Sequence, residues 1–352
     1  MVKFLRITII NIFIGLILFC SLELVFGYWF DKDNLGPYVR EYRMRKNTYD
    51  VVFDKKRYVF EYKRNYYGFR GKEIPLDQIS AVLVGGSTAD ERYKPEEFTI
   101  TEVVNKEISK EISNIKIFNA GIEGQSTRGH LANLKYWFPK LKNFKPKYLI
   151  YYIGINDQSL AGAEDDTGDG VVIDSNTGQR IWDNIKTRSI FYDLARKYKH
   201  KYYTSEKKVI YDFDAGSQKY NEKQKKKNLE FLTYKEFIKK NSIENVLKTK
   251  NPIIKNYLSR VDKLYDKSIE SGSIPVFINQ LDGTGFHNKL LVSLNFFLID
   301  HCKKNKYYCV DLAMELNGKQ DYWWDGLHTT PKGSEAIASI VAPKLVEIFK
   351  KN

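Results

Sequence analysis

The chain is poor in the residues that staple small domains together or bind metals. It has three cysteines in 352 residues, too few for a disulfide-rich scaffold, so apolar burial must hold the fold together. Cys302 and Cys309 flank a predicted helix-to-strand turn and could pair in an oxidising compartment or stay buried thiols. The five histidines and three cysteines show no clustered spacing typical of zinc ligands, and we expect no metal and no cofactor. Nine prolines without a G-x-y period exclude collagen, and 43% hydrophobic residues exclude wholesale disorder.

One long apolar run lies at the N-terminus. Residues 7–30 carry a single charge, Glu23, and at about 1.5 Å per residue they would span a hydrocarbon core of roughly 30 Å. Lys3 and Arg6 precede the run and two aspartates follow it, which favours the N-terminus inside and the body outside. Four basic residues on the far side oppose this orientation: Arg40, Arg43, Arg45 and Lys46. We expect a single-pass membrane protein with an extracytoplasmic body.

Two other N-terminal signals fit the run less well. A cleaved signal peptide needs small residues at its cleavage site, and Val-Phe-Gly at 25–27 is a poor substitute. A lipid anchor at Cys20 needs a small residue where Phe19 stands. Tyr28 and Trp29 suit the aromatic belt at a membrane surface. An uncleaved anchor is therefore favoured over a cleaved signal, and a soluble cytoplasmic protein is the least favoured interpretation.

The body alternates short apolar runs with amphipathic stretches, and its length suggests about two domains. The apolar runs predict buried strands over residues 79–84, 115–118, 148–153, 274–278 and 307–312. The other stretches predict helices over residues 97–113, 126–143, 252–271, 288–304 and 331–349, the last capped by Thr330 with Pro331 following. Strands and helices that alternate in this way predict an α/β protein, in which helices cover both faces of a parallel sheet.

Residues 161–260 interrupt this alternation. Between Arg196 and Arg260 there are 18 Lys or Arg against 7 Asp or Glu, so most of the net charge of +14 lies here. Lysines interleaved with tyrosines suit an anionic glycan or lipid headgroups, and the alternative is an ordinary solvated helical face. Nucleic acid is a poor partner for a body outside the membrane. The domains we predict are an anchor (1–30), a linker (31–78), a core domain in two parts (79–160 and 261–352) and a basic helical insertion (161–260).

In an open parallel sheet, function gathers at the carboxyl ends of the strands, and four loops there carry polar residues. After the first strand, the sequence GGST at 85–88 would present the Ser87 hydroxyl at the start of a helix. The loop at 119–125 holds Gly124, whose N–H could approach a reacting centre, and the loop at 154–157 holds the Asn156 amide. No G-x-x-x-x-G-K-[ST] motif is present at GGST, so a phosphate-binding loop is not expected.

The fourth loop brings a carboxylate and an imidazole together. Asp325 and His328 are three residues apart, so the carboxylate can hold Nδ1–H and leave Nε2 as a base. Each motif alone is weak, because a serine after a strand is more often a helix cap. Their joint order predicts an active site with nucleophile, base, acid and oxyanion donors. His287 would also reach this edge unless it lies in a surface loop; the histidines expected elsewhere are His130, His200 and His301.

These four loops resemble the conserved blocks of the SGNH/GDSL hydrolases, over about residues 79–160 and 273–352. The resemblance matches Ser87 to the nucleophile, Asp325 to the acid and His328 to the base. It matches the oxyanion hole to the Ser87 N–H, Gly124 and Asn156. It implies a flavodoxin-like parallel five-stranded sheet in a three-layer α/β/α sandwich.

Two further features bear on this resemblance. Gly86 stands where the aspartate of the GDSL name lies in the family, and that aspartate is not a triad member. The sequence NYYGFRG at 65–71 is similar to that of anchored relatives linked to surface polysaccharides. The insertion has no counterpart in small family members, so the family says little about the substrate.

The resemblance implies a serine esterase that removes acyl groups, acetyl above all, from a cell-envelope carbohydrate or glycolipid. The first alternative is an O-acyltransferase that acts on a surface polysaccharide with the same triad. The second is a lipase or lysophospholipase, and the third is a non-enzymatic member of an envelope assembly. A complete triad counts against the third. A single membrane segment offers no obvious route for a cytoplasmic acyl donor, which slightly favours the esterase over the acyltransferase.

Overall fold

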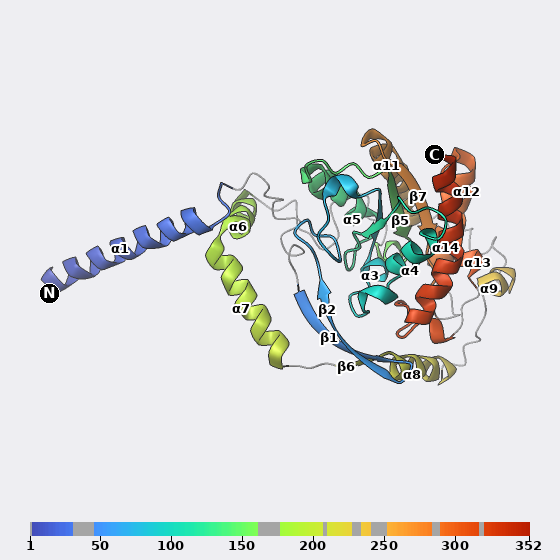
Figure 1. The fold of residues 1–352 in the computed structure, drawn as a ribbon, viewed down its shortest axis with the longest axis horizontal. Helices are drawn as coiled ribbons and strands as arrows, with labels where there is room; N and C mark the ends of the chain where they lie inside the picture. The colour runs from blue at the N-terminus through green and yellow to red at the C-terminus, as the bar shows by residue number, and fades with distance from the viewer. Residues whose placement is uncertain are drawn as a thin grey trace.

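A five-stranded parallel sheet forms the centre of the molecule (Figure 1). The computed structural model describes residues 2–30, 46–160, 177–206, 210–226, 234–240, 252–283, 289–316 and 320–352. The strand order is β4-β3-β5-β7-β8, the flavodoxin-like order in which the second strand of the sheet lies outside the first. The strands are β3 (Ala81–Gly85), β4 (Ile117–Asn119), β5 (Tyr148–Ile153), β7 (Ile274–Asn279) and β8 (Tyr308–Val310). The predicted α/β class and sheet are confirmed.

Helices cover both faces of this sheet and make it a three-layer sandwich. On one face lie α4 (Ile100–Ile108) and α14 (Pro331–Lys351), whose apolar side chains join one buried cluster. On the other face lie α5 (Thr127–Ala132), α11 (Pro252–Glu270) and α12 (Lys289–Asn305), which join a second cluster. Every residue of β5 is buried, as a strand covered on both sides requires.

The helix expected over residues 126–143 is shorter than predicted. It is α-helical only in α5 and continues as a π-helical turn (Asn133–Trp137) and a 3₁₀ turn (Phe138–Lys140). Pro139 explains the end of the helix, because proline has no N–H to donate and its ring crowds the preceding turn. The helix expected over 97–113 is likewise reduced to α4, capped by the Thr99 side chain.

A second, smaller sheet lies beside the first. Strands β1 (Lys46–Phe53) and β2 (Lys56–Lys63) form an antiparallel hairpin within the stretch interpreted as a linker. Asp54 and Lys55 form its two-residue turn with φ of 50° and 58°, the twist that suits a tight hairpin. Strand β6 (Ile210–Asp212), from the insertion, pairs with β1 in parallel. The domain boundaries given above stay predictions.

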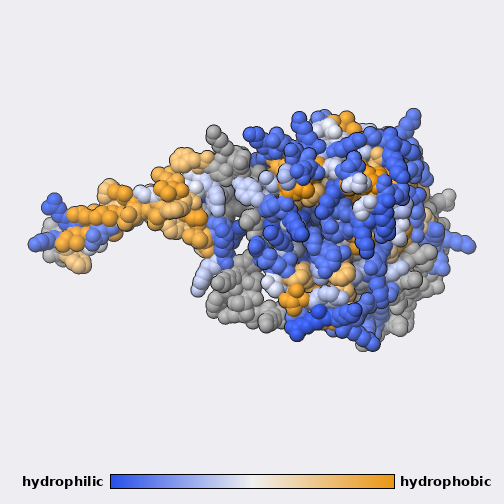
Figure 2. Space-filling view, in the orientation of Figure 1, coloured by the Kyte–Doolittle hydropathy of each residue, from blue (hydrophilic) through white to orange (hydrophobic). Residues whose placement is uncertain are grey.

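Apart from β6, the described residues of the insertion are mainly helical. They include α6 (Thr177–Arg188), α7 (Ile190–Glu206), α8 (Phe213–Lys226) and α9 (Tyr234–Lys240). The N-terminal helix α1 (Val2–Phe26) projects from the body and meets α6 and α7 at its C-terminal end (Figure 1). It is the one helix among the described residues that is long and apolar enough to cross a membrane. Figure 2 shows its hydrophobic surface against a largely hydrophilic body.

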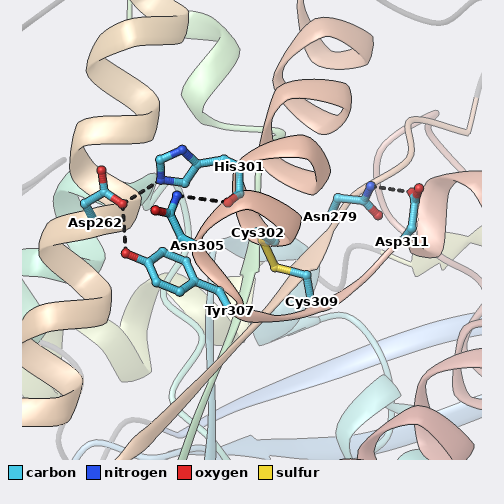
Figure 3. Close-up of a disulfide and its surroundings, with 8 residues drawn as sticks. All are labelled: Asp262, Asn279, His301, Cys302, Asn305, Tyr307, Cys309 and Asp311. Atoms are coloured by element: carbon cyan, nitrogen blue, oxygen red, sulfur yellow. Dashed lines mark hydrogen bonds and ion pairs between the residues drawn. A yellow bond between two sulfur atoms is a disulfide. The ribbon is translucent and has the colours of Figure 1, made fainter.

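Cys302 and Cys309 form a disulfide bond between α12 and β8 (Figure 3). Beside it, Asp262 of α11 contacts His301 Nε2 at 2.6 Å and accepts a hydrogen bond of 3.1 Å from the Tyr307 hydroxyl. Of the two alternatives for these cysteines, the structure has the disulfide and not two separate thiols. His301 belongs to this surface cluster and not to the edge where the four loops meet.

Candidate active site

Ser87 lies at the turn between β3 and the short helix α3 (Ser87–Asp90). Glycine precedes it, and a Cβ there would force its neighbours to shift, because it would lie 2.3 Å from Asn156 Nδ2 and 2.9 Å from the Gln125 carbonyl oxygen. The Asn156 amide is thus held directly against the backbone that leads into Ser87. The absence of the family's aspartate at this position has a local physical reason.

Ser87, His328 and Asp325 form a continuous chain of hydrogen bonds. His328 Nε2 lies 2.9 Å from Ser87 Oγ, and His328 Nδ1 lies 2.6 Å from Asp325 Oδ2. The second carboxylate oxygen of Asp325 accepts the backbone N–H groups of Leu327 at 2.9 Å and His328 at 2.8 Å. The structure thus brings together two side chains that are 241 residues apart in the sequence.

The charge on Asp325 determines which nitrogen of the His328 imidazole carries the hydrogen. Burial alone would raise the pKa of Asp325, but hydrogen bonds and charge from His328, with two backbone N–H groups, lower that pKa below 3.8 overall. An ionised carboxylate can only accept hydrogen bonds. Nδ1 of a neutral His328 must therefore carry the hydrogen, and the Nε2 lone pair faces the Ser87 hydroxyl. This tautomer is the one that can take a proton from serine.

The loops predicted to supply oxyanion donors lie against the same turn. Asn156 Nδ2 donates to the Gln125 carbonyl at 2.8 Å. Gly124 precedes Gln125 and has a φ of +79°, a left-handed conformation that glycine adopts at little cost. The backbone of this loop is tied to β3, since the Ile122 N–H donates to the Gly85 carbonyl at 2.9 Å.

Gln280, at the end of β7, is a positioning residue that sequence reasoning missed. It is buried, and its Nε2 donates to Thr88 Oγ1 at 2.7 Å while its Oε1 accepts the Ile155 N–H at 2.8 Å. It therefore links the neighbour of Ser87 to the neighbour of Asn156. The available signal was a pair of polar side chains, Asn279 and Gln280, directly after the strand predicted over residues 274–278.

The sequence NYYGFRG at 65–71 also has a role that its residues alone did not reveal. Arg70 donates to the carbonyl of Asp90, and its Nη2 donates to the Lys94 carbonyl at 2.6 Å. Arg64, just before this sequence, pairs with Asp90 Oδ1 at 2.9 Å and donates to the Gly121 carbonyl at 2.8 Å. Both guanidinium groups are buried. The stretch that follows the hairpin, from Arg64 to Arg70, thus holds the segment after Ser87.

A buried ion pair fixes the His328 loop to the same segment. Lys94 contacts the Glu91 carboxylate, and its Nζ donates to Thr329 Oγ1 at 2.8 Å. Thr329 also donates to Glu91 at 2.9 Å. Burial lowers the pKa of Lys94 although Glu91 acts to raise it. Because Thr329 follows His328 directly, this cluster anchors the backbone next to His328.

Aromatic side chains from three parts of the chain, one of them the insertion, form one wall of the site. The Trp324 ring stacks on His328 with ring centres 5.9 Å apart, and on Phe213 of α8 at 4.9 Å. Tyr93 meets Trp324 edge-on at 6.1 Å. The hollow beside Ser87 has a volume of about 330 Å³, including space open to solvent.

Comparison with known proteins identifies the family. The family model described as GDSL-like Lipase/Acylhydrolase matches residues 82–341. The chain belongs to this family. It is accordingly a hydrolase that acts on ester bonds. No curated protein matches the chain.

Several solved structures are similar at low sequence identity. The esterase EstA from a Pseudoalteromonas species has 13% identity and a TM-score of 0.43, over 78% of this chain and 100% of its own. An acetylxylan esterase from Geobacillus stearothermophilus has 13% identity and a TM-score of 0.41, over 75% and 93%. A lipolytic G-D-S-L family member from Veillonella parvula has 10% identity and a TM-score of 0.42, over 77% and 98%.

Two further points concern residues outside the four loops. His287 lies outside the described residues, so its place near the pocket stays a prediction. Within the part of the chain that the structure describes, no group of three or more His, Cys, Asp or Glu side chains could hold a metal ion.

Proposed function

We propose that this hydrolase is a serine esterase that removes short acyl groups, acetyl above all, from a cell-envelope carbohydrate or glycolipid. The observation that carries the proposal is the hydrogen-bonded chain from Ser87 through His328 to Asp325. Such a chain makes a serine hydroxyl nucleophilic at neutral pH. The membership in an acylhydrolase family supports an ester as the bond that is broken.

In the proposed reaction, Ser87 Oγ attacks the ester carbonyl carbon while its proton passes to His328 Nε2. Asp325 stabilises the imidazolium that forms. The oxyanion is stabilised by the N–H groups of Ser87 and Gly124 and by the Asn156 amide, each typically worth about 3 kcal/mol of barrier. The leaving alkoxide takes the proton from His328, and an acyl-serine remains. Water then attacks the acyl group, gives a proton to His328, and releases the acid as that proton returns to Ser87.

The walls of the site support a short acyl group on a sugar. The hollow beside Ser87 is small, about 330 Å³ even with space open to solvent, and suits an acetyl group better than a long chain, which needs an extended apolar groove. The apolar faces of Trp324, Phe213 and Tyr93 suit the apolar face of a sugar ring. Arg92 and Glu123 form an ion pair at the rim and can hydrogen-bond to sugar hydroxyls.

We propose that α1 anchors the protein in a membrane and that the catalytic body lies on the extracytoplasmic side. The helix is long enough to cross a bilayer, and the positive N-terminal flank favours this orientation. The disulfide between Cys302 and Cys309 supports an oxidising compartment, because cytosolic thiols are kept reduced.

A panel of esters tests the function. We expect rapid release of acetate from nitrophenyl acetate and acetylated oligosaccharides, with slow turnover of long-chain esters. Ser87→Ala should lower kcat/KM by about 10⁴-fold or more, whereas the same substitution at the exposed Ser339 on α14 should leave it unchanged. Equal activity in Ser87→Ala would refute the serine mechanism. Faster long-chain turnover would instead assign a lipase, and acyl transfer to an added oligosaccharide would assign an acyltransferase.

A further inference from the structure

The one acidic residue of the apolar helix α1 has its partners in the insertion. Glu23 is buried, and its carboxylate accepts hydrogen bonds of 2.5 Å from Ser189 Oγ and 3.1 Å from the Ile190 N–H. The first N–H groups of a helix have no partner within that helix, so Glu23 caps α7 from outside. The Tyr28 N–H donates to the Arg188 carbonyl at the end of α6 at 2.8 Å. The junction of α6 and α7 is thereby fixed to the end of α1.

Large apolar side chains of α6 and α7 are left in solvent. Among the described residues beyond Phe30, these two helices carry six of the eleven exposed large apolar side chains: Ile181, Trp182, Ile185, Tyr192, Leu194 and Tyr198. A concentration of this kind marks a surface that contacts another phase or partner. The two helices also carry seven Lys or Arg against three Asp or Glu. Lys186 Nζ lies 5.5 Å from the centre of the Trp182 ring, the mixture of aromatic and basic groups typical of membrane surfaces.

The geometry places these helices at the level of a bilayer surface. In Figure 1, α7 runs crosswise to α1 and not alongside it. Phe191 of α7 stacks on Phe19 of α1 with ring centres 4.6 Å apart. Phe19 lies seven residues before the end of α1, or about 10 Å along the helix. Amphipathic helices that lie in the interface bury their apolar face by about 5–10 Å, so the two depths agree.

We propose that α6 and α7 form a second membrane contact, which lies flat on an anionic lipid surface next to the point where α1 enters it. The lipid bilayer is the occupant because this surface adjoins the one described helix able to cross a membrane. Its basic excess complements anionic headgroups. The hydrogen bonds of Glu23 to the start of α7 fix the depth of α6 and α7 in the membrane relative to α1. This membrane contact is separate from the esterase activity and does not depend on it.

Spin labels on the full chain in lipid vesicles test the proposal. Cys20 is replaced by alanine, and single labelled cysteines are placed at Leu194 and, as a control on a different face of the same helix, at Lys199. A third label at Ile12, in the middle of α1, reports whether the anchor itself is inserted. In vesicles that contain phosphatidylglycerol, the ratio of oxygen to nickel-chelate accessibility at Leu194 should exceed that at Lys199 by roughly threefold or more.

The accessibility ratios at the three labelled positions separate the membrane contact of α7 from the insertion of α1. Equal ratios at Leu194 and Lys199, with a buried label at Ile12, would overturn the proposal while leaving the anchor intact. The accessibility ratio at Leu194 should fall when phosphatidylcholine replaces the anionic lipid, because the membrane surface then no longer attracts the basic side chains of α6 and α7. A ratio that does not change with lipid charge would overturn the assignment of an anionic surface. Esterase assays on detergent-solubilised protein should be the same for all labelled variants.

Discussion

The role of Asp325 can be tested by a change of one atom. In Asp325→Asn, the side-chain oxygen can still accept the N–H groups of Leu327 and His328, which Oδ1 now accepts at 2.9 and 2.8 Å. The new NH₂ group then faces His328 Nδ1, 2.6 Å away. Because the amide donates there, Nδ1 must become an acceptor and the hydrogen moves to Nε2. The imidazole then donates to Ser87 and can no longer take its proton.

The expected loss is large because it removes the base and not the binding. A wrong tautomer of this kind lowers kcat by about 10⁴-fold, which corresponds to about 5.4 kcal/mol of transition-state stabilisation. The two retained backbone hydrogen bonds should keep the change in unfolding free energy below about 1 kcal/mol. KM should change little, since Asp325 does not line the hollow where the acyl group would bind.

The assay is hydrolysis of nitrophenyl acetate with purified protein, together with urea unfolding. Asp321→Asn is the matched control, because Asp321 lies in the same segment with its side chain 56% exposed and only a 3.7 Å contact to Lys332. A loss of less than tenfold in Asp325→Asn would refute the reasoning that Asp325 fixes the His328 tautomer. A large loss of stability in that variant would mean that it disrupts the loop and not the proton position.

Three further predictions follow from contacts described above. Gly86→Ala should lower kcat/KM by about 10²-fold, because the added methyl would displace Asn156; circular dichroism should show an unchanged fold, and unchanged kinetics would contradict the close approach. Replacing Cys302 and Cys309 together by alanine should lower the unfolding free energy by about 2.5 kcal/mol for this short loop, measured in urea, with ester turnover preserved; reductant should have no effect on the double variant. Asp325 has a lowered pKa in the folded protein, so it stabilises the fold above its unfolded value near 3.8 and loses this effect as the pH falls through the lower folded pKa. The difference in unfolding free energy between wild type and Asp325→Asn should therefore shrink below about pH 4, and a constant difference from pH 6 to pH 3 would contradict it.

The central sheet could be predicted because each of its parts leaves a local mark in the sequence. Strand β5 is a continuous apolar run, and α14 begins at a threonine cap followed by proline. The four loops follow from topology, because parallel strands bring their carboxyl ends to one edge. The contact between Ser87 and His328 was therefore predictable from order alone, although their distance was not.

The second sheet and the site's supports could not be predicted in the same way. Strand β1 pairs with β6, which lies about 160 residues later in the sequence. No local sequence pattern indicates which strands will pair over such a distance. The buried arginines Arg64 and Arg70 are charged residues that sequence reasoning places on a surface. Only the fold shows that their partners are carbonyl and carboxylate groups around the turn at Asp90.

The brevity of the connection between α7 and β6 limits the reach of the enzyme. Three residues separate Glu206, the last of α7, from Ile210, and even fully extended they allow about 14 Å. Phe213, three residues further on, already touches the Trp324 ring beside His328. The site around Ser87 therefore stays close to the C-terminal end of α7. With α7 on the membrane as we propose, a polymeric substrate would have to approach the membrane surface for its ester groups to reach Ser87.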